Sequence, residues 1–88
     1  MSDMKDDSAF KEQLDDHYQW PSKYLFKFIV PKGNESQFED IFPGEVLKFR
    51  VSKGGKYISI SADVVMNSSE EVMDIYRKAY KIEGVISL

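Results

Sequence analysis

Residues 45–65 read EVLKFRVSKGGKYISISADVV, and this stretch decides the fold. Its two halves alternate apolar and polar residues, which is the period of a strand with one buried face. The glycines of Lys53-Gly54-Gly55-Lys56 can adopt the positive φ of a tight turn. We therefore predict a hairpin of strands 45–52 and 57–65. Its inward residues are expected to be Leu47, Phe49, Val51, Ile58, Ile60, Ala62 and Val64.

Before the hairpin, residues 24–30 read YLFKFIV and predict a third strand. The single charge, Lys27, marks the outward side, so Phe26 and Phe28 are expected in the core. Because the other side also carries Leu25 and Ile29, the strand is apolar on both faces. That composition is typical of a central position in a sheet.

Two helices are expected between the strands. The first begins with a capping box of Asn34 and Gln37, buries three side chains, and ends at Pro43-Gly44 after about two turns. The second begins with a capping box of Ser68 and Glu71. Residues 85–88, after Gly84, predict a short last strand. The buried side chains of the helices are expected to be Phe38, Ile41 and Phe42 in the first, and Val72, Ile75, Tyr76 and Ala79 in the second.

The order strand, helix, strand, strand, helix, strand predicts an α+β protein with the ferredoxin-like βαββαβ sandwich. Right-handed crossovers give a four-stranded antiparallel sheet of order 4-1-3-2 with two helices on one face. At 88 residues the chain has room for a single domain, expected over residues 20–88.

Residues 1–19 are expected to be an acidic, partly disordered N-terminal extension. Residues 1–20 hold six acids against two bases, and the remainder of the chain holds nine acids against ten bases. Within the extension, Phe10 and Leu14 could share one side of a helix of one or two turns capped by Ser8. The acidic segment could also fold over the cations of the sheet and compete with an anionic partner.

The sequence contains no set of residues that predicts a catalytic site or a metal site. The chain has no cysteine, so thiolate nucleophiles and cysteine-ligated metals are excluded. Its one histidine, His17, lies among acids in the N-terminal segment, where an exposed and idle side chain is expected. Ser59 and Ser61 have no histidine nearby to serve as a base. We therefore expect no enzyme and no cofactor, and a cytoplasmic protein with no membrane association.

The hairpin segment SKGGKYISIS, residues 52–61, resembles the signature of the YbeD-like bacterial proteins of unknown function. Trp20-Pro21, Phe26-Lys27-Phe28, Tyr76 and Ile82 also fit this resemblance, which covers residues 20–88. It implies a ferredoxin-like fold similar to the regulatory ligand-binding domains of amino-acid metabolic enzymes, and hence a binding or regulatory role. The first helix is shorter here than in the family pattern, and the family defines no catalytic residues to carry over.

The open face of the predicted sheet is the candidate site. Three cations and three hydroxyls are expected together on it beside Leu25 and Ile29; they are Lys27, Lys48, Arg50, Tyr57, Ser59 and Ser61. One interpretation is an ordinary solvated sheet face with spaced charges and no binding role. The other is a surface that binds a small anionic ligand or a protein partner.

Two function classes remain open. The first is a non-enzymatic binding or regulatory domain whose partner, a small anionic ligand or a protein, is unknown. The alternative is a single-stranded nucleic-acid-binding module. Nucleic acid is the less favoured partner, because Tyr57 is the only aromatic residue expected on the open face; exposure of Phe26 or Phe28 would favour it. A weak homodimer is left open, although Lys48 and Arg50 disfavour one formed through their edge strand.

Overall fold

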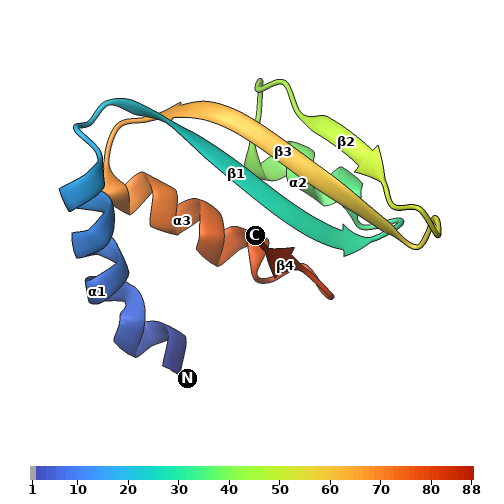
Figure 1. Cartoon of the computed structure of the whole chain (residues 1–88), viewed down its shortest axis with the longest axis horizontal. Coiled ribbons are helices and arrows are strands. Elements are labelled where there is room, and N and C mark those ends of the chain that lie inside the picture. The colour runs from blue at the N-terminus through green and yellow to red at the C-terminus, as the bar shows by residue number, and fades with distance from the viewer. Residues whose placement is uncertain (1) are drawn as a thin grey trace.

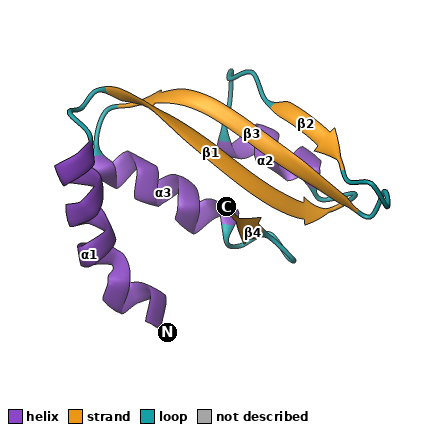
Figure 2. Cartoon of the chain, in the orientation of Figure 1, coloured by secondary structure: helices purple, strands orange, loops and turns teal. Residues whose placement is uncertain are grey.

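The computed structural model describes the backbone of residues 2–88 and the side chains of residues 8–88. Its strands are β1 (Ser22–Pro31), β2 (Lys48–Val51), β3 (Tyr57–Met66) and β4 (Ile86–Ser87). Its helices are α1 (Ser2–His17), α2 (Phe38–Ile41), which a 3-10 turn η1 (Glu35–Gln37) precedes, and α3 (Ser69–Ala79). Figures 1 and 2 show the long β1 and β3 strands crossing the molecule with the helices against one side of them.

The sheet confirms the expected α+β, ferredoxin-like arrangement. The strand order is β2-β3-β1-β4, which is the predicted order read from the other edge, and every pairing is antiparallel. β1 lies between β3 and β4, as its two apolar faces predicted. β1 and β3 pair over their whole lengths, from Ser22 opposite Met66 to Pro31 opposite Tyr57.

The core fills the space between the sheet and the helices. Phe26, Phe28 and Ile60 are fully buried on the inner face of the sheet. Phe38, which begins α2, and Phe42, which follows it, pack with tilted rings on Phe28 and Phe26, with ring centroids 5.2 and 5.3 Å apart. Because α2 is too short to be stable alone, these ring contacts are what hold it on the sheet.

The first strand of the hairpin, β2, is shorter and more exposed than expected. β2 covers only residues 48–51 of the predicted 45–52, and all four of its residues are exposed. Phe49 is 45% exposed and Val51 54%, so their expected place in the core is wrong. Their side chains are on the inner face, but α2 has a single turn of α-helix and does not extend over the outer edge of the sheet.

The two predicted capping boxes have different outcomes. At α3, the Ser68 hydroxyl accepts the Glu71 N–H at 3.2 Å, as expected, and the Glu71 carboxylate accepts the Asn67 N–H at 2.8 Å. At η1 the box is absent. Asn34 has helical backbone angles, so its side chain cannot turn back to cap, and it donates instead to the Glu83 carbonyl at 3.0 Å.

The N-terminal segment forms a longer helix than predicted. α1 begins at Ser2, so Ser8 is not its cap. Leu14 is 4% exposed within the core, and the Phe10 ring meets Tyr76 of α3 edge-on at 5.6 Å. Packing therefore extends N-terminal to the expected domain boundary at residue 20. Partial disorder within residues 1–19 stays a prediction, and the side chains of Asp3, Asp6 and Asp7 lie outside the described ones.

Leu14→Ala tests whether α1 is part of the packed domain. Removing a buried leucine side chain costs the lost burial plus a cavity, so we expect the free energy of unfolding to fall by about 2–3 kcal/mol. Gln13→Ala, at the exposed neighbouring position, should change it by less than about 0.5 kcal/mol. Urea denaturation followed by circular dichroism measures both. Equal effects of the two substitutions would show that α1 does not contribute to the core.

Gly84→Ala tests the turn that brings β4 against β1. Gly84 has φ of +80°, and a Cβ there would lie 2.7 Å from Cγ of Pro31. Backbone strain and this clash should together lower the free energy of unfolding by about 2–3 kcal/mol. Gly44→Ala, with φ of +79° and open space around it, isolates the strain at about 1 kcal/mol. If Gly84→Ala lowered the free energy of unfolding no more than Gly44→Ala does, the Pro31 side chain would have to move aside at no cost.

Tyr76→Phe tests a pH dependence within the core. The Tyr24 and Tyr76 hydroxyls are 3.0 Å apart. Burial raises the pKa of both above the ordinary tyrosine value, and the Tyr24 hydrogen bond raises the pKa of Tyr76 further. The unfolded chain therefore loses these protons first, so the stability that they contribute is complete below about pH 10 and decreases above it.

Between pH 10 and 11.5, the wild-type chain should lose about 1 kcal/mol more stability than Tyr76→Phe, a value reduced because the ring is only part-buried. Urea denaturation at each pH measures the difference. Tyr57→Phe, at an exposed tyrosine, is the control and should follow the wild type. The same alkaline loss in all three proteins would exclude the Tyr24–Tyr76 pair as its source.

Candidate functional site

The register of the sheet places the six predicted site residues on one face. Lys27 and Lys48 stand on either side of Ser61, and Arg50 stands beside Ser59 with Ile29 beyond it. Each of these residues alternates along its strand with one on the inner face. Tyr57, at the start of β3, has the same parity as Ser59 and is 46% exposed. We call this side of the sheet the open face.

A shallow hollow lies at the hairpin end of the open face. It has a volume of about 410 Å³ and is lined by Ile29, Arg50, Val51, Ser52, Lys53, Tyr57 and Ser59. Three of the predicted residues, Arg50, Tyr57 and Ser59, line it together. Lys27, Lys48 and Ser61 lie one row further along the sheet and do not line it.

The sequence interpretation missed Lys53 as a site residue. It was assigned to the hairpin turn, where it does lie, but the turn carries it to the rim of the hollow. Gly55 supplies the positive φ of that turn, at +77°. The Gly55 N–H donates to the Ser52 carbonyl at 2.9 Å, which closes the turn. Strand alternation gives no signal for it, because Lys53 lies in the turn beyond the end of β2.

The two serine hydroxyls that line the hollow form hydrogen bonds with the backbone. The Ser59 hydroxyl donates to the Arg50 carbonyl at 3.4 Å, and the Ser52 hydroxyl accepts the Tyr57 N–H at 3.1 Å. These bonds cross-link the hairpin. They stabilise its turn end, where the hollow lies.

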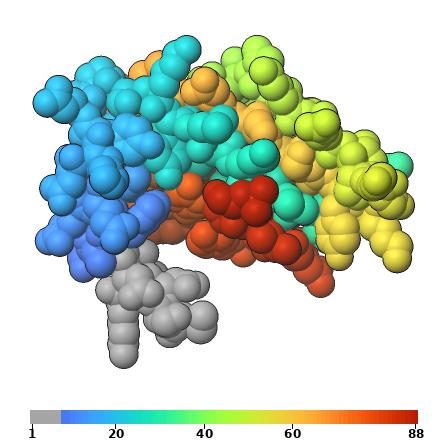
Figure 3. All heavy atoms as spheres, in the orientation of Figure 1, coloured from blue at the N-terminus to red at the C-terminus, as the bar shows by residue number. Residues whose placement is uncertain are grey.

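β4 adds an apolar margin to the open face. Ile86 lies beside Ile29, and the Leu88 N–H donates to the Lys27 carbonyl at 2.9 Å. Ile86 is 53% exposed and Leu88 64%. Figure 3 shows these last residues, in red, against the teal atoms of β1. The open face therefore joins cations on the β2 side to apolar side chains on the β4 side.

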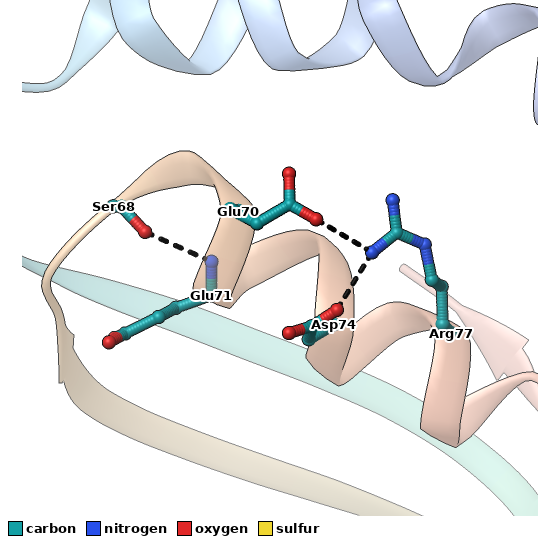
Figure 4. A network of polar contacts seen from close by, with 5 residues as sticks. All are labelled: Ser68, Glu70, Glu71, Asp74 and Arg77. Atoms are coloured by element: carbon teal, nitrogen blue, oxygen red, sulfur yellow. Dashed lines mark hydrogen bonds and ion pairs between the residues drawn. The ribbon is translucent and has the colours of Figure 1, made fainter.

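The cations of the open face lack carboxylate partners among the described residues. Arg77 on α3 shows the contrast: its guanidinium lies 3.0 Å from Glu70 and 2.7 Å from Asp74 (Figure 4). The other described ion pair, Lys11 with Asp15, is on α1. Asp63 is exposed on the open face but pairs across the sheet with Leu25. Lys27, Lys48 and Arg50 therefore keep a net positive field around the hollow.

The described part of α1 does not cover this face. Phe10 packs on Tyr76 of α3, on the other side of the sheet, and the Trp20 indole N–H donates to Asp15 at 2.9 Å. This hydrogen bond lowers the pKa of Asp15. The hypothesis that the acidic segment folds over Lys27, Lys48 and Arg50 is therefore wrong for residues 8–17. The apolar stripe of Phe10, Leu14 and Tyr18 directs α1 to the helix layer.

Residues for other chemistries are dispersed. His17 is exposed at the end of α1, as expected. Among residues with described side chains, no group of three or more histidine, aspartate or glutamate residues could hold a metal ion. Within the described chain, no helix combines the length and apolar character needed to cross a membrane.

Comparison with known proteins gives the family. A search of curated proteins and a search of solved structures returned no significant match. The family model described as "Protein of unknown function (DUF493)" matches residues 15–88, which is most of the chain. The match includes Asp15, Tyr18 and Trp20, at the end of α1 and the start of the sheet. Fold, hairpin and family match therefore agree: the chain belongs to DUF493, the YbeD-like family of proteins of unknown function.

Proposed function

We propose that this chain is a small non-enzymatic binding domain with a regulatory role, and that the open face binds an anionic ligand. The observation that carries the proposal is the hollow that Arg50 lines together with Ile29 and Tyr57, because Arg50 has no carboxylate partner among the described residues. Its volume of about 410 Å³ is in the range of small-molecule sites.

The chemistry of the hollow favours a small organic acid. The Arg50 guanidinium presents a planar fork that pairs with both oxygens of a carboxylate or phosphate. Lys53 adds a second cation at the rim, and Ile29 supplies an apolar floor for the carbon skeleton. The anionic group of the ligand would be oriented by the cations, and its carbon skeleton would be buried against Ile29. A bare inorganic anion would make only the first contact, and a neutral hydrocarbon only the second.

The arrangement also suits a regulatory role. Residues of β1, β2, β3 and the hairpin turn line the hollow, so a ligand there would contact three strands and the turn that joins two of them. It would stabilise the sheet relative to any state in which the hairpin turn opens. A protein partner that docks on the same face would compete with the ligand for Arg50.

The nucleic-acid alternative gains no support from the fold. Phe26 and Phe28, whose exposure would have favoured it, are fully buried. Tyr57 is the one aromatic side chain that the described strands place on the open face. A single ring is a poor platform for successive stacked bases.

An amide chemical-shift titration of the labelled whole chain tests the proposed site. The panel holds amino acids, dicarboxylic acids, inorganic phosphate, nucleotides and a single-stranded oligonucleotide. We expect an organic acid to move the amides of Ile29, Arg50, Lys53 and Ser59. Arg50→Gln should weaken its binding about tenfold or more, as loss of a hydrogen bond to a charged group predicts.

Arg77→Gln is the matched control, because it removes the same charge from the helix layer. It should leave the affinity within about twofold of the wild type. Equal losses of affinity in the two variants would show that net charge, and not the position of Arg50, determines binding. Shifts confined to α3 or to the α2 side would place the ligand elsewhere. A stronger response to the oligonucleotide than to every acid would replace the proposal with the nucleic-acid alternative.

A further inference from the structure

β2 is an open edge of the sheet. It pairs with β3 on one side, and no described strand lies on the other. Figure 1 shows β2 at the margin of the molecule, with α2 behind the sheet and not across this edge. All four residues of β2 are exposed, so the edge is accessible along its length.

The register shows which backbone groups are unpaired. The Ser52 N–H donates to the Tyr57 carbonyl at 2.8 Å, which makes this a hydrogen-bonded pair of the antiparallel ladder. Such pairs alternate, so Arg50 and Lys48 also direct their backbone groups toward β3. The N–H and C=O groups of Phe49 and Val51 therefore point away from the sheet, as a template for one more strand.

The side chains of this edge differ between its two faces. Lys48 and Arg50 stand on the open face, without carboxylate partners among the described residues. Phe49 and Val51 stand on the inner face, 45% and 54% exposed. Beside Phe49 a second hollow of about 220 Å³ is lined by Glu39, Phe42, Gly44, Glu45, Leu47 and Phe49. The edge is thus cationic on one face and apolar, with an acidic rim, on the other.

We propose that the β2 edge binds an extended segment of a partner protein that carries an acidic residue at every second position. Its backbone would pair with Phe49 and Val51. Its acids would stand beside Lys48 and Arg50, and its intervening apolar side chains would cover Phe49 and Val51. Glu39 and Glu45 repel acids from the inner face, which fixes the side that the acids occupy.

A second copy of this chain fits the edge less well. When two β2 strands pair antiparallel about a two-fold axis, the open faces of both copies lie on the same side. Lys48 and Arg50 of one copy then stand next to those of the other, and like charges across a strand pair are destabilising. The charge therefore selects an acidic strand over a copy of β2.

This binding mode differs from the one proposed for the small acid. It depends on the unpaired backbone of β2 and on Phe49 and Val51, which do not face the open side. The two modes share Arg50, and Val51 also lines the hollow, so they could compete there. Either proposal can fail without the other.

The test is a titration of the labelled whole chain with a blocked peptide of alternating glutamate and valine. We expect the Phe49 and Val51 amides to shift and to exchange their hydrogens more slowly. A matched peptide of alternating lysine and valine should bind at least about tenfold more weakly. Equal binding of the two peptides, or shifts away from β2, would overturn the proposal.

Val51→Pro removes one outward N–H and leaves the bonds between β2 and β3 intact, which an edge strand tolerates. It should weaken the glutamate peptide at least about tenfold, whereas Val51→Ala, which keeps the N–H, should weaken it about threefold or less. Methylating alternate peptide nitrogens removes the facing donors without altering the protein, and should give the same loss. Unchanged affinity for the methylated peptide would exclude strand pairing.

Two further outcomes separate strand pairing at the β2 edge from peptide binding on the open face and from pairing with a second copy of the chain. Lys27→Ser, distant from the edge, should leave peptide affinity within about twofold of the wild type. A larger loss would place the peptide on the open face and overturn edge pairing. Shifts of Phe49 and Val51 with protein concentration alone would assign the edge to a second copy and overturn the acidic partner.

Discussion

The pairing of β1 with β3 is the constraint on which the rest of the structure depends. These strands match over ten positions, and every second position points inward, so Phe26, Phe28, Ile58 and Ile60 form the base of the core. The same alternation sends Lys27, Ser59 and Ser61 outward. A slip of one residue would exchange the two faces and bury Lys27, which no described group could neutralise there. The burial that stabilises the fold therefore also determines the open face.

Interactions that follow from alternation could be predicted from the sequence, because they depend on neighbouring residues alone. The buried faces of β1 and β3 and most of the stripe of α3 are of this kind, although Tyr76 is only half-buried and Met73, which was not predicted, is buried. The sheet order follows from the order of the elements with right-handed crossovers. The cap at Ser68 also depends only on residues within one turn. The shared face of the six site residues follows from the same rule once the strands are paired, and the structure places all six there.

Interactions between distant segments could not be predicted in this way. Leu14 lies in a polar segment, and its burial depends on the packing of α1 against α3, which only the folded chain provides. Asn34 bonds to Glu83 rather than capping its own turn, because the loops after β1 and before β4 meet. The hollow similarly needs Ile29 from one strand and Lys53 from a turn. None of these pairings leaves a periodic signal in the sequence.

The exposure of Phe49 and Val51 joins the fold to its proposed binding properties. Pro43-Gly44 ends α2 early, and a helix of one turn covers the centre of the sheet but not its β2 edge. A longer helix could bury these side chains, and only the cations Lys48 and Arg50 would then be exposed at the edge. The short helix instead leaves apolar side chains beside unpaired backbone, a combination that favours association with another strand. Lys48 and Arg50 limit that association, because their charge opposes a strand of like charge and favours an acidic one. The length of α2 and the charge of β2 thus act together: the first exposes the edge, and the second restricts what can pair with it.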